Sequence, residues 1–336
     1  MFNPSFGDMT QQFQSTRQTA QVKSRLNTLA NELTSGLVAD VTAHLRGDTT
    51  QFAALNRDIA LIDGYRQSAS EVAFVFDQMQ VTLGTVDTLR TTLSNQFLLV
   101  MPETPLKQID AAAAAGRDGF RAIVGNLNQR FADRTLFAGT AVDGPALADA
   151  ETMLADLAAS LTSSTSAATI AADVAAWFDT PGGGFEMSGY LGATGPGVTR
   201  KLGDCDSVSS NLRADDQGLR DVMKSAALAA LADLMAGTLS PETRAQMVAD
   251  AGLGLASAGA SLTATRGTLG EAQATTDAAL TRLSASRTTL DMARNDLIAI
   301  DPFATATRLQ DVQQQLEMLF TVTARISGLS LASFLR

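Results

Sequence analysis

The residues that most often carry nucleophilic or metal chemistry are scarce in this chain. Its 336 residues include one histidine, His44, and one cysteine, Cys205. A single cysteine excludes an intramolecular disulfide framework and a cysteine-rich zinc site. A Ser-His-Asp or Cys-His-Asp relay would depend entirely on His44, and no glycine elbow surrounds a candidate serine. We therefore expect no catalytic residue, no cofactor and no metal site.

Glycine clusters and neighbouring carboxylates are the remaining features that could bind a ligand. The run Gly182–Gly184 lacks the strand–glycine–helix context and the lysine of a phosphate-binding loop, so it predicts an ordinary turn. Asp204 with Asp206, and Asp215 with Asp216, could in principle hold a hard cation. Acidic residues are also favourable at helix N-termini, which is the interpretation that we favour here.

The composition favours helices and excludes two classes of partner. Hydrophobic residues make up 45% of the chain, but aromatic residues only 5%, which is typical of helices with thin cores. The net charge of −10 and the absence of a compact basic block argue against nucleic acid and membrane surfaces as partners. No apolar run reaches the roughly 18–20 residues that cross a bilayer, and the first residues do not resemble a cleavable secretory signal. These features alone predict a cytoplasmic protein.

The elements that must position any site are long helices, and one of them dominates. Leucine recurs every seven residues, with a single threonine substituted, and a strict seven-residue repeat keeps one apolar seam against a partner helix. Small residues three positions further on predict close packing. Six heptads form a helix of roughly 60 Å, too long for the core of an ordinary globule. The predicted seam consists of Leu255, Leu262, Leu269, Leu283, Leu290 and Leu297.

Three-and-four spacing of apolar residues predicts further helices. Residues 50–101 form a second long helix, the natural mate of the seam, and Pro102 and Pro105 end it. Residues 10–33 form a helix with so sparse an apolar stripe that it would be marginal alone. Ser240-Pro241 is a favourable start for the helix that carries the seam. The other predicted helices cover residues 106–136, 145–178 (one or two short helices), 215–235 and the segment after Asp301-Pro302.

Two further features of the sequence concern a small insert and the last helix. Apolar runs at 185–191 and 198–202, separated by glycine turns, are the only predicted strands and belong to a small insert. The last helix carries an apolar stripe with little left in the chain to cover it. We expect burial against other molecules, with packing on the same subunit as the alternative. The stripe consists of Leu309, Val312, Leu316, Leu319, Ile326, Leu329, Leu331, Phe334 and Leu335.

Several of these segments resemble the flagellin superfamily. The endings at 307–316 (TRLQ and QQQL) and 326–335 (ISGLSLASFL) look like the C-terminus of that superfamily, and more like its hook–filament junction family, hook-associated protein 3, than filament flagellin. The segment Leu29–Leu37 (LANELTSGL) resembles the end of the family's N-terminal helix. Arg134–Thr140 (RTLFAGT) resembles the sequence before the junction family's variable domain. Val38–Val41 departs from the aspartate pair usual in flagellins.

The resemblance, which covers about residues 10–140 and 215–336, implies a flagellar role. It implies an axial subunit that is exported through the flagellar type III apparatus without a cleaved signal, which places the protein in the extracellular flagellum. Similar proteins form a ring of identical subunits at the hook–filament junction. They contact hook-associated protein 1 on one side and flagellin on the other, and an export chaperone covers their apolar C-terminal region beforehand.

The expected fold is mainly α, a long antiparallel coiled-coil rod built from the N- and C-terminal halves, with a small α/β insert in the middle. The expected domains are a terminal helical assembly region that is disordered in the monomer (1–48 and 301–336), a discontinuous rod (49–140 and 215–300) and the insert (141–214). The expected function is a junction adaptor without catalysis. Alternatives are a filament flagellin and a cytoplasmic coiled-coil signalling protein, with an enzyme a distant third.

Overall fold

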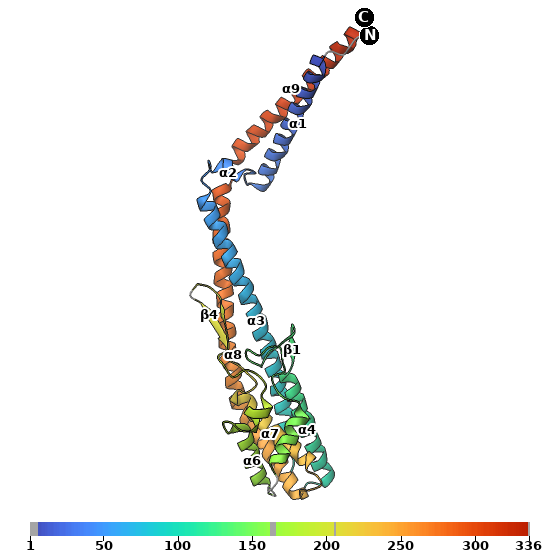
Figure 1. Ribbon diagram of the computed structural model, residues 1–336, viewed down its shortest axis with the longest axis vertical. Coiled ribbons are helices and arrows are strands. Elements are labelled where there is room, and N and C mark those ends of the chain that lie inside the picture. Colours follow the sequence, from blue (N-terminus) through green and yellow to red (C-terminus); the bar gives the residue numbers. More distant parts are fainter. Residues whose placement is uncertain (1–5, 162–165, 205, 335–336) are drawn as a thin grey trace. The chain divides into compact units, whose positions relative to one another are not determined.

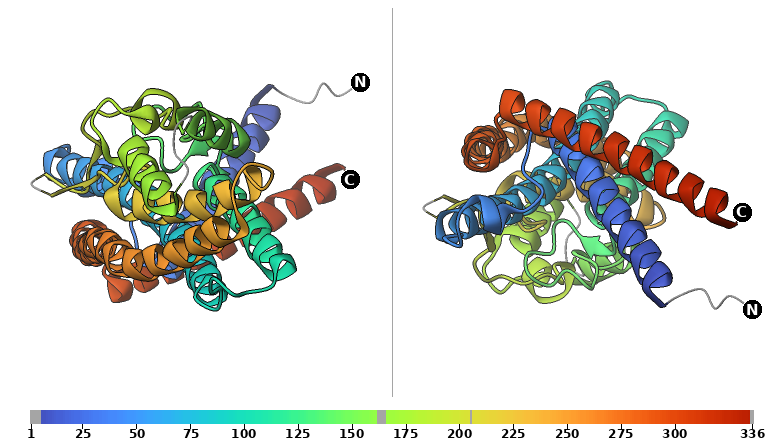
Figure 2. Two further views of the ribbon diagram at one scale, coloured as in Figure 1. Left: turned by 90° about the horizontal axis from the view of Figure 1, so that it is seen from below. Right: turned by 90° about the horizontal axis from the view of Figure 1, so that it is seen from above.

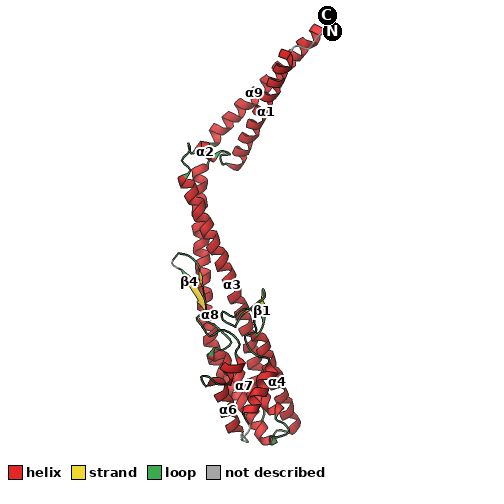
Figure 3. Cartoon of the chain, viewed as in Figure 1, coloured by secondary structure: helices red, strands yellow, loops and turns green. Residues whose placement is uncertain are grey.

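The computed structural model describes residues 6–161, 166–204 and 206–334. These residues are mainly helical, as the sequence predicts, and include two short antiparallel hairpins (Figures 1 and 3). The elements in chain order are α1 (Phe6–Ser35), α2 (Val41–His44), α3 (Thr50–Phe97), α4 (Leu106–Leu127), β1 (Arg130–Phe131), β2 (Arg134–Thr135), α5 (Ala150–Ser160), α6 (Ala167–Asp179), the π-helix η1 (Phe185–Gly189), β3 (Val198–Lys201), β4 (Ser207–Ser210), α7 (Gln217–Leu234), α8 (Pro241–Ile298) and α9 (Pro302–Phe334).

The chain divides into two compact units. The first, called the terminal unit here, comprises Met1–Asp63 and Ala285–Arg336, and the second, called the central unit, comprises Gly64–Ser284. Helices α3 and α8 each contribute residues to both units. The three-part division expected from the sequence, with a separate insert at 141–214, stays a prediction.

In the central unit, α3 and α8 run antiparallel along each other. Near the end of α3, the Ser94 hydroxyl donates a 2.9 Å hydrogen bond to the carbonyl of Gly252. Earlier in α3, Asp77 accepts a 2.7 Å hydrogen bond from the side-chain amide of Gln273, which lies later in α8. Glycine at 252 permits this approach, because a Cβ there would lie only 3.0 Å from the Phe97 Cβ. The predicted pairing of the two longest helices is confirmed.

The core of the central unit lies where α4 and α7 pack together, with α5 and α6 beside them (Figure 2). Small residues bring α4 and α7 close, since a Cβ at Gly116 would lie 2.6 Å from the Ala229 Cβ. The buried Arg244 links three helices: it forms a 2.7 Å ion pair with Asp110 of α4 and donates a 2.7 Å hydrogen bond to the Ala232 carbonyl of α7. A thin, alanine-rich core is therefore compensated by short interhelical distances.

Helix α4 ends earlier than the sequence predicts, at Leu127 instead of residue 136. The Asn128 side chain exchanges two hydrogen bonds with the backbone of Leu147, at 2.9 and 2.8 Å, and so holds the chain away from the helical path. Ala132 and Asp133 then adopt positive φ angles of 47° and 61°. Two such residues between paired strands form the tight turn that joins β1 to β2.

The strand predicted at 185–191 is wrong, because Phe185–Gly189 forms a π-helix. The Tyr190 amide donates a 2.7 Å hydrogen bond to the Phe185 carbonyl, which closes the wide turn. Packing explains it: the Phe185 ring lies 6.0 Å from that of Trp177 and 5.3 Å from that of Phe178. The strand predicted at 198–202 is confirmed as β3, which pairs with β4, a polar strand that its sequence did not reveal.

Candidate assembly surfaces

In the terminal unit, hydrogen bonds join the connection that follows α1 to the connection between α8 and α9. After α1 the chain turns at Gly36, whose φ is +73°, a conformation that favours glycine. The Val38 amide donates to the Ile298 carbonyl at 3.0 Å, and the Ile300 amide donates to the Gly36 carbonyl at 3.0 Å. Asp40 then caps α2 by accepting from the Ala43 amide at 2.9 Å. The segment that departs from the flagellin pattern thus connects α1 to α2 and is held against the connection between α8 and α9.

Helices α1 and α9 lie side by side and antiparallel in the terminal unit (Figure 1). The hydroxyls of Ser15 and Thr323 lie 3.4 Å apart toward one end, and Leu37 and Ala299 form a β-bridge at the other. Burial between them is sparse. Among the α1 residues whose side chains are described, Val22 is the buried hydrophobic one. A pair of helices with so little to bury is a weak interface by itself.

The helix pair also carries exposed apolar side chains. Phe303 is 83% exposed, and the Phe320 ring, about half exposed, lies 5.4 Å beneath the ammonium group of Lys23. Large exposed apolar side chains on one element indicate a surface that binds another molecule. Helical spacing places three of them on one side of α9, and this set, Phe303, Met318 and Val322, is called the outer apolar face here.

The stripe predicted on the last helix lies partly between α1 and α9. Val312 is buried, and Leu309, Leu316 and Leu319 are half-buried. The backbones of Ile326, Leu329, Leu331 and Phe334 belong to α9, but their side chains lie outside the described residues, as does Leu335 altogether. The role of this stripe in assembly or chaperone binding stays a prediction.

The predicted leucine seam changes in burial along α8. Leu255, Leu262 and Leu269 are buried in the central unit, together with Thr276, the one position where threonine replaces leucine. The later seam residues, Leu283, Leu290 and Leu297, are half-buried. The seam is therefore best covered where α8 also packs against the central core.

The residues considered for cation binding are engaged in ordinary contacts. Asp204 accepts a 2.9 Å hydrogen bond from the Tyr65 hydroxyl, and that bond raises the pKa of Tyr65 above its ordinary value. Asp206 forms a 2.6 Å ion pair with Arg282. Cys205, between them, lies outside the described residues. Each of the two carboxylates thus has a partner on a neighbouring helix, α3 or α8.

The second acidic pair behaves as the helix start that the sequence favours. Asp215 forms an ion pair with Arg213 at 2.8 Å, and Asp216 caps α7 by accepting from the Gly218 amide at 3.1 Å. His44 is exposed at the end of α2. Within the described part of the chain, no cluster of three or more His, Cys, Asp or Glu side chains could hold a metal ion. Nor is any described helix long and apolar enough to cross a membrane.

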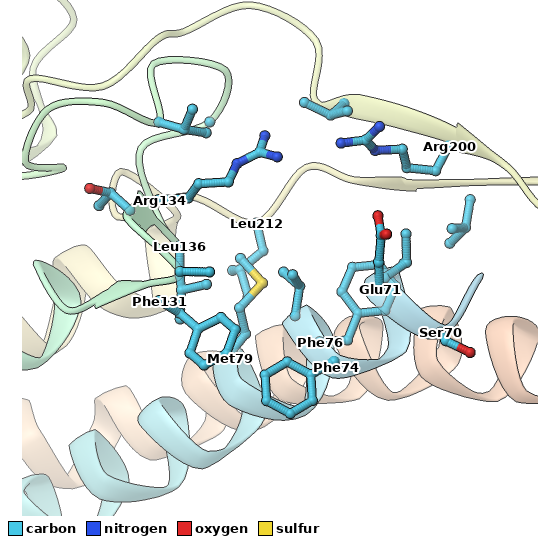
Figure 4. Close-up of a pocket in the computed structure, with 18 residues that line it drawn as sticks. Ser70, Glu71, Phe74, Phe76, Met79, Phe131, Arg134, Leu136, Arg200 and Leu212 are labelled. Carbon is cyan, nitrogen blue, oxygen red and sulfur yellow. The ribbon is translucent and has the colours of Figure 1, made fainter. Parts of the chain in front are cut away.

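Sequence reasoning did not find an apolar groove in the central unit, formed by α3 and the two hairpins (Figure 4). Its volume is about 520 Å³, and its floor includes Phe74 and Phe131, whose rings lie 4.6 Å apart. Its charged lining residues are Glu71, Arg134 of β2 and Arg200 of β3, and Figure 4 shows the two guanidinium groups reaching toward each other above the floor. Of the hairpin strands that form its walls, only the one at 198–202 was predicted from the sequence.

Comparison with known proteins gives one family match and a likeness in fold. Residues 254–335, which include α9 and most of α8, match the family model of the bacterial flagellin C-terminal helical region. The resemblance to the flagellin superfamily is thereby confirmed over these residues. The chain also resembles the solved structure of a protein from Vibrio parahaemolyticus described as a flagellar hook-associated protein, with 13% identity and a TM-score of 0.51 over 73% of this chain and 95% of that one. At this identity the likeness shows the fold. No curated protein matches the chain.

Proposed function

We propose that this protein is a structural subunit of the bacterial flagellum, without catalysis, that forms a junction ring between hook and filament. The observation that carries the proposal is the terminal helix pair, whose α9 lies within a flagellin C-terminal helical region. In the proposed assembly, copies of the chain contact one another, hook-associated protein 1 and flagellin through this pair. The subunit travels through the flagellar type III apparatus to the extracellular flagellum.

The burial pattern supports a helix pair whose exposed apolar side chains are covered by neighbouring subunits in the assembly. Val22 and Val312 are buried between α1 and α9, whereas the outer apolar face stays in contact with water. Isolated helices gain most of their stability from packing of an apolar face, so neighbouring copies that cover the outer face would stabilise the pair. An export chaperone would cover the apolar stripe of the last helix before assembly.

The choice of a junction protein over filament flagellin depends on finer features. Arg134–Thr140 resembles the segment before the junction family's variable domain, and it forms β2 and the chain that follows. Val38–Val41 forms the ordered connection after α1, in place of the aspartate pair usual in flagellins. The likeness in fold to a protein described as flagellar hook-associated adds to this. A filament flagellin would instead polymerise alone into long filaments.

The experiment that tests the proposal is complementation of a deletion strain with variants of the outer apolar face. We expect Met318→Asp with Val322→Asp to abolish filament attachment, because two carboxylates would enter an apolar contact. The matched control is Met318→Leu with Val322→Ile, which keeps the face apolar. Electron microscopy of cells and the flagellin content of the medium provide the measurement.

Three outcomes separate the possibilities. Hooks without filaments, and flagellin in the medium, support the junction role. Normal filaments on cells that carry the double aspartate variant contradict assembly through this face. Normal motility in the deletion strain itself, with the protein confined to the cytoplasm, contradicts the flagellar role and favours the coiled-coil signalling protein.

A further inference from the structure

The central unit exposes a second apolar feature, whose charge is opposite to that of the groove. The connection from α3 to α4, residues 98–106, exposes Leu98, Leu99, Met101 and Leu106, with Leu99 80% exposed. The only charge within this segment is Glu103. We call it the apolar turn. A large apolar side chain this exposed loses contact with water only when another molecule covers it.

The apolar turn is held in one conformation by its own hydrogen bonds. The Thr104 amide donates to the Met101 carbonyl at 2.9 Å, and the Met101 amide donates to the Thr104 hydroxyl at 2.8 Å. Pro102 lies between them, with its φ fixed by the ring. Val100, 7% exposed, anchors the segment to the core. A segment ordered in advance loses little conformational entropy when it binds, so such a turn is suited to be an inserted element.

The groove offers complementary chemistry. In a chain with a net charge of −10, its lining contains two arginines and one carboxylate. That carboxylate, Glu71, already accepts a 2.9 Å hydrogen bond from the side-chain amide of Gln67. Arg134 and Arg200 form no ion pair with another described residue. An entering apolar segment with one carboxylate would contact Phe74 below and these guanidinium groups above (Figure 4).

We infer that the apolar turn of one copy binds the groove of a second copy, with Glu103 paired to Arg134 and Arg200. The two surfaces of a single copy cannot meet. Phe76 in the groove and Phe97 at the end of α3 belong to one continuous helix, so about 30 Å of rigid helix separates them. The contact is therefore between copies, joins two different surfaces and repeats from copy to copy.

The inference rests on the proposed assembly of identical subunits, for which it supplies one repeated contact. Because two unlike surfaces meet, each copy keeps a free turn and a free groove after the first contact. Such contacts close into a ring when the rotation between copies allows it, and extend otherwise.

Disulfide trapping between two differently tagged copies tests this contact. In a Cys205→Ser background, one copy carries Leu99→Cys in the turn and the other Val198→Cys at the rim of the groove. The control pair replaces Val198→Cys with Leu253→Cys, an exposed position on α8. We expect about tenfold more mixed dimer from the turn–groove pair than from the control pair, because the bound geometry raises the effective concentration of the two thiols.

Charge reversal tests whether the mixed dimers form through the proposed ion pairs or through random collision of the two copies. Arg200→Glu in the groove copy should lower the yield of mixed dimer severalfold, and Glu103→Arg in the turn copy should restore it. Both positions are exposed, and the fluorescence of Trp177 confirms that each variant is folded. Equal yields from the turn–groove and control pairs overturn the inference, as does a reversal without effect.

The disulfide-trapping experiment and the complementation experiment can fail independently of each other. Trapped dimers in a protein that proves dispensable for the flagellum would leave the contact standing and remove the junction role. Filament attachment that survives Arg200→Glu, together with untrapped dimers, would leave the junction role standing and remove the contact.

Discussion

The leucine seam of α8 allows one substitution to be compared at two positions of the same helix. Leu262 is 1% exposed in the central unit, whereas Leu290 is half-buried in the terminal unit. Replacing a fully buried leucine by alanine costs about 2–5 kcal/mol, from lost transfer free energy and the cavity left behind. We expect about 3 kcal/mol for Leu262→Ala and roughly half that for Leu290→Ala, because the exposed part of Leu290 has no packing to lose.

The single tryptophan reports the central unit selectively. Trp177 is buried there, so its fluorescence follows unfolding of that unit, while circular dichroism at 222 nm follows helix in both. With a urea m-value of about 2–3 kcal/mol per M, Leu262→Ala should lower the fluorescence midpoint by about 1–1.5 M. Leu290→Ala should leave that midpoint unchanged and alter only the circular dichroism curve. An equal fall of the fluorescence midpoint in both variants would refute the reasoning, since local burial would then not set the cost.

Two further predictions concern the central unit. Gly116→Ala should destabilise it by about 1–3 kcal/mol, because the new Cβ would lie 2.6 Å from that of Ala229. The same substitution at Gly125, which has open space around it, should stabilise by about 0.5–1 kcal/mol, and equal effects in urea titrations would contradict this account. Hydrogen bonds from Arg117 and a second arginine lower the pKa of Glu151 from 4.5 to about 2. This depressed pKa stabilises the fold above pH 4.5 and ceases to do so as pH falls toward 2, so the midpoint difference between wild type and Glu151→Gln should shrink over that window.

Two helix starts were predictable because their signals are local. The sequence placed the start of the seam helix at Ser240-Pro241, and α8 begins at Pro241, with the Ser240 hydroxyl accepting from the Thr243 amide at 3.2 Å. The last helix was expected after Asp301-Pro302, and α9 begins at Pro302, with Asp301 capping the amide of Phe303 at 2.9 Å. A cap and a proline act within one turn, so no distant residue is needed to interpret them.

The sequence predictions failed where residues distant in the chain determine the local conformation. The apolar run that begins at Phe185 had the period and length of a strand, but its conformation follows from contact with Trp177, eight positions earlier on a neighbouring helix. Helix α4 ends because Asn128 bonds the backbone of Leu147, a partner that no local pattern identifies. The groove was invisible for the same reason: its walls are two hairpins that the sequence did not predict in full.

The burial of the α9 stripe constrains how the terminal helices can act. The sequence predicted burial of Val312 and Leu316 against other molecules, with packing on the same subunit as the alternative. In the structure this side of α9 faces α1, with Val312 buried. A chaperone that binds this stripe must therefore displace α1, whereas a neighbour in the assembly can bind the outer apolar face while the pair stays intact. Because Val22 is the buried hydrophobic side chain described on α1, displacement would cost little. A weak pair of this kind can exchange one partner for another, which is what the proposed export and assembly would require.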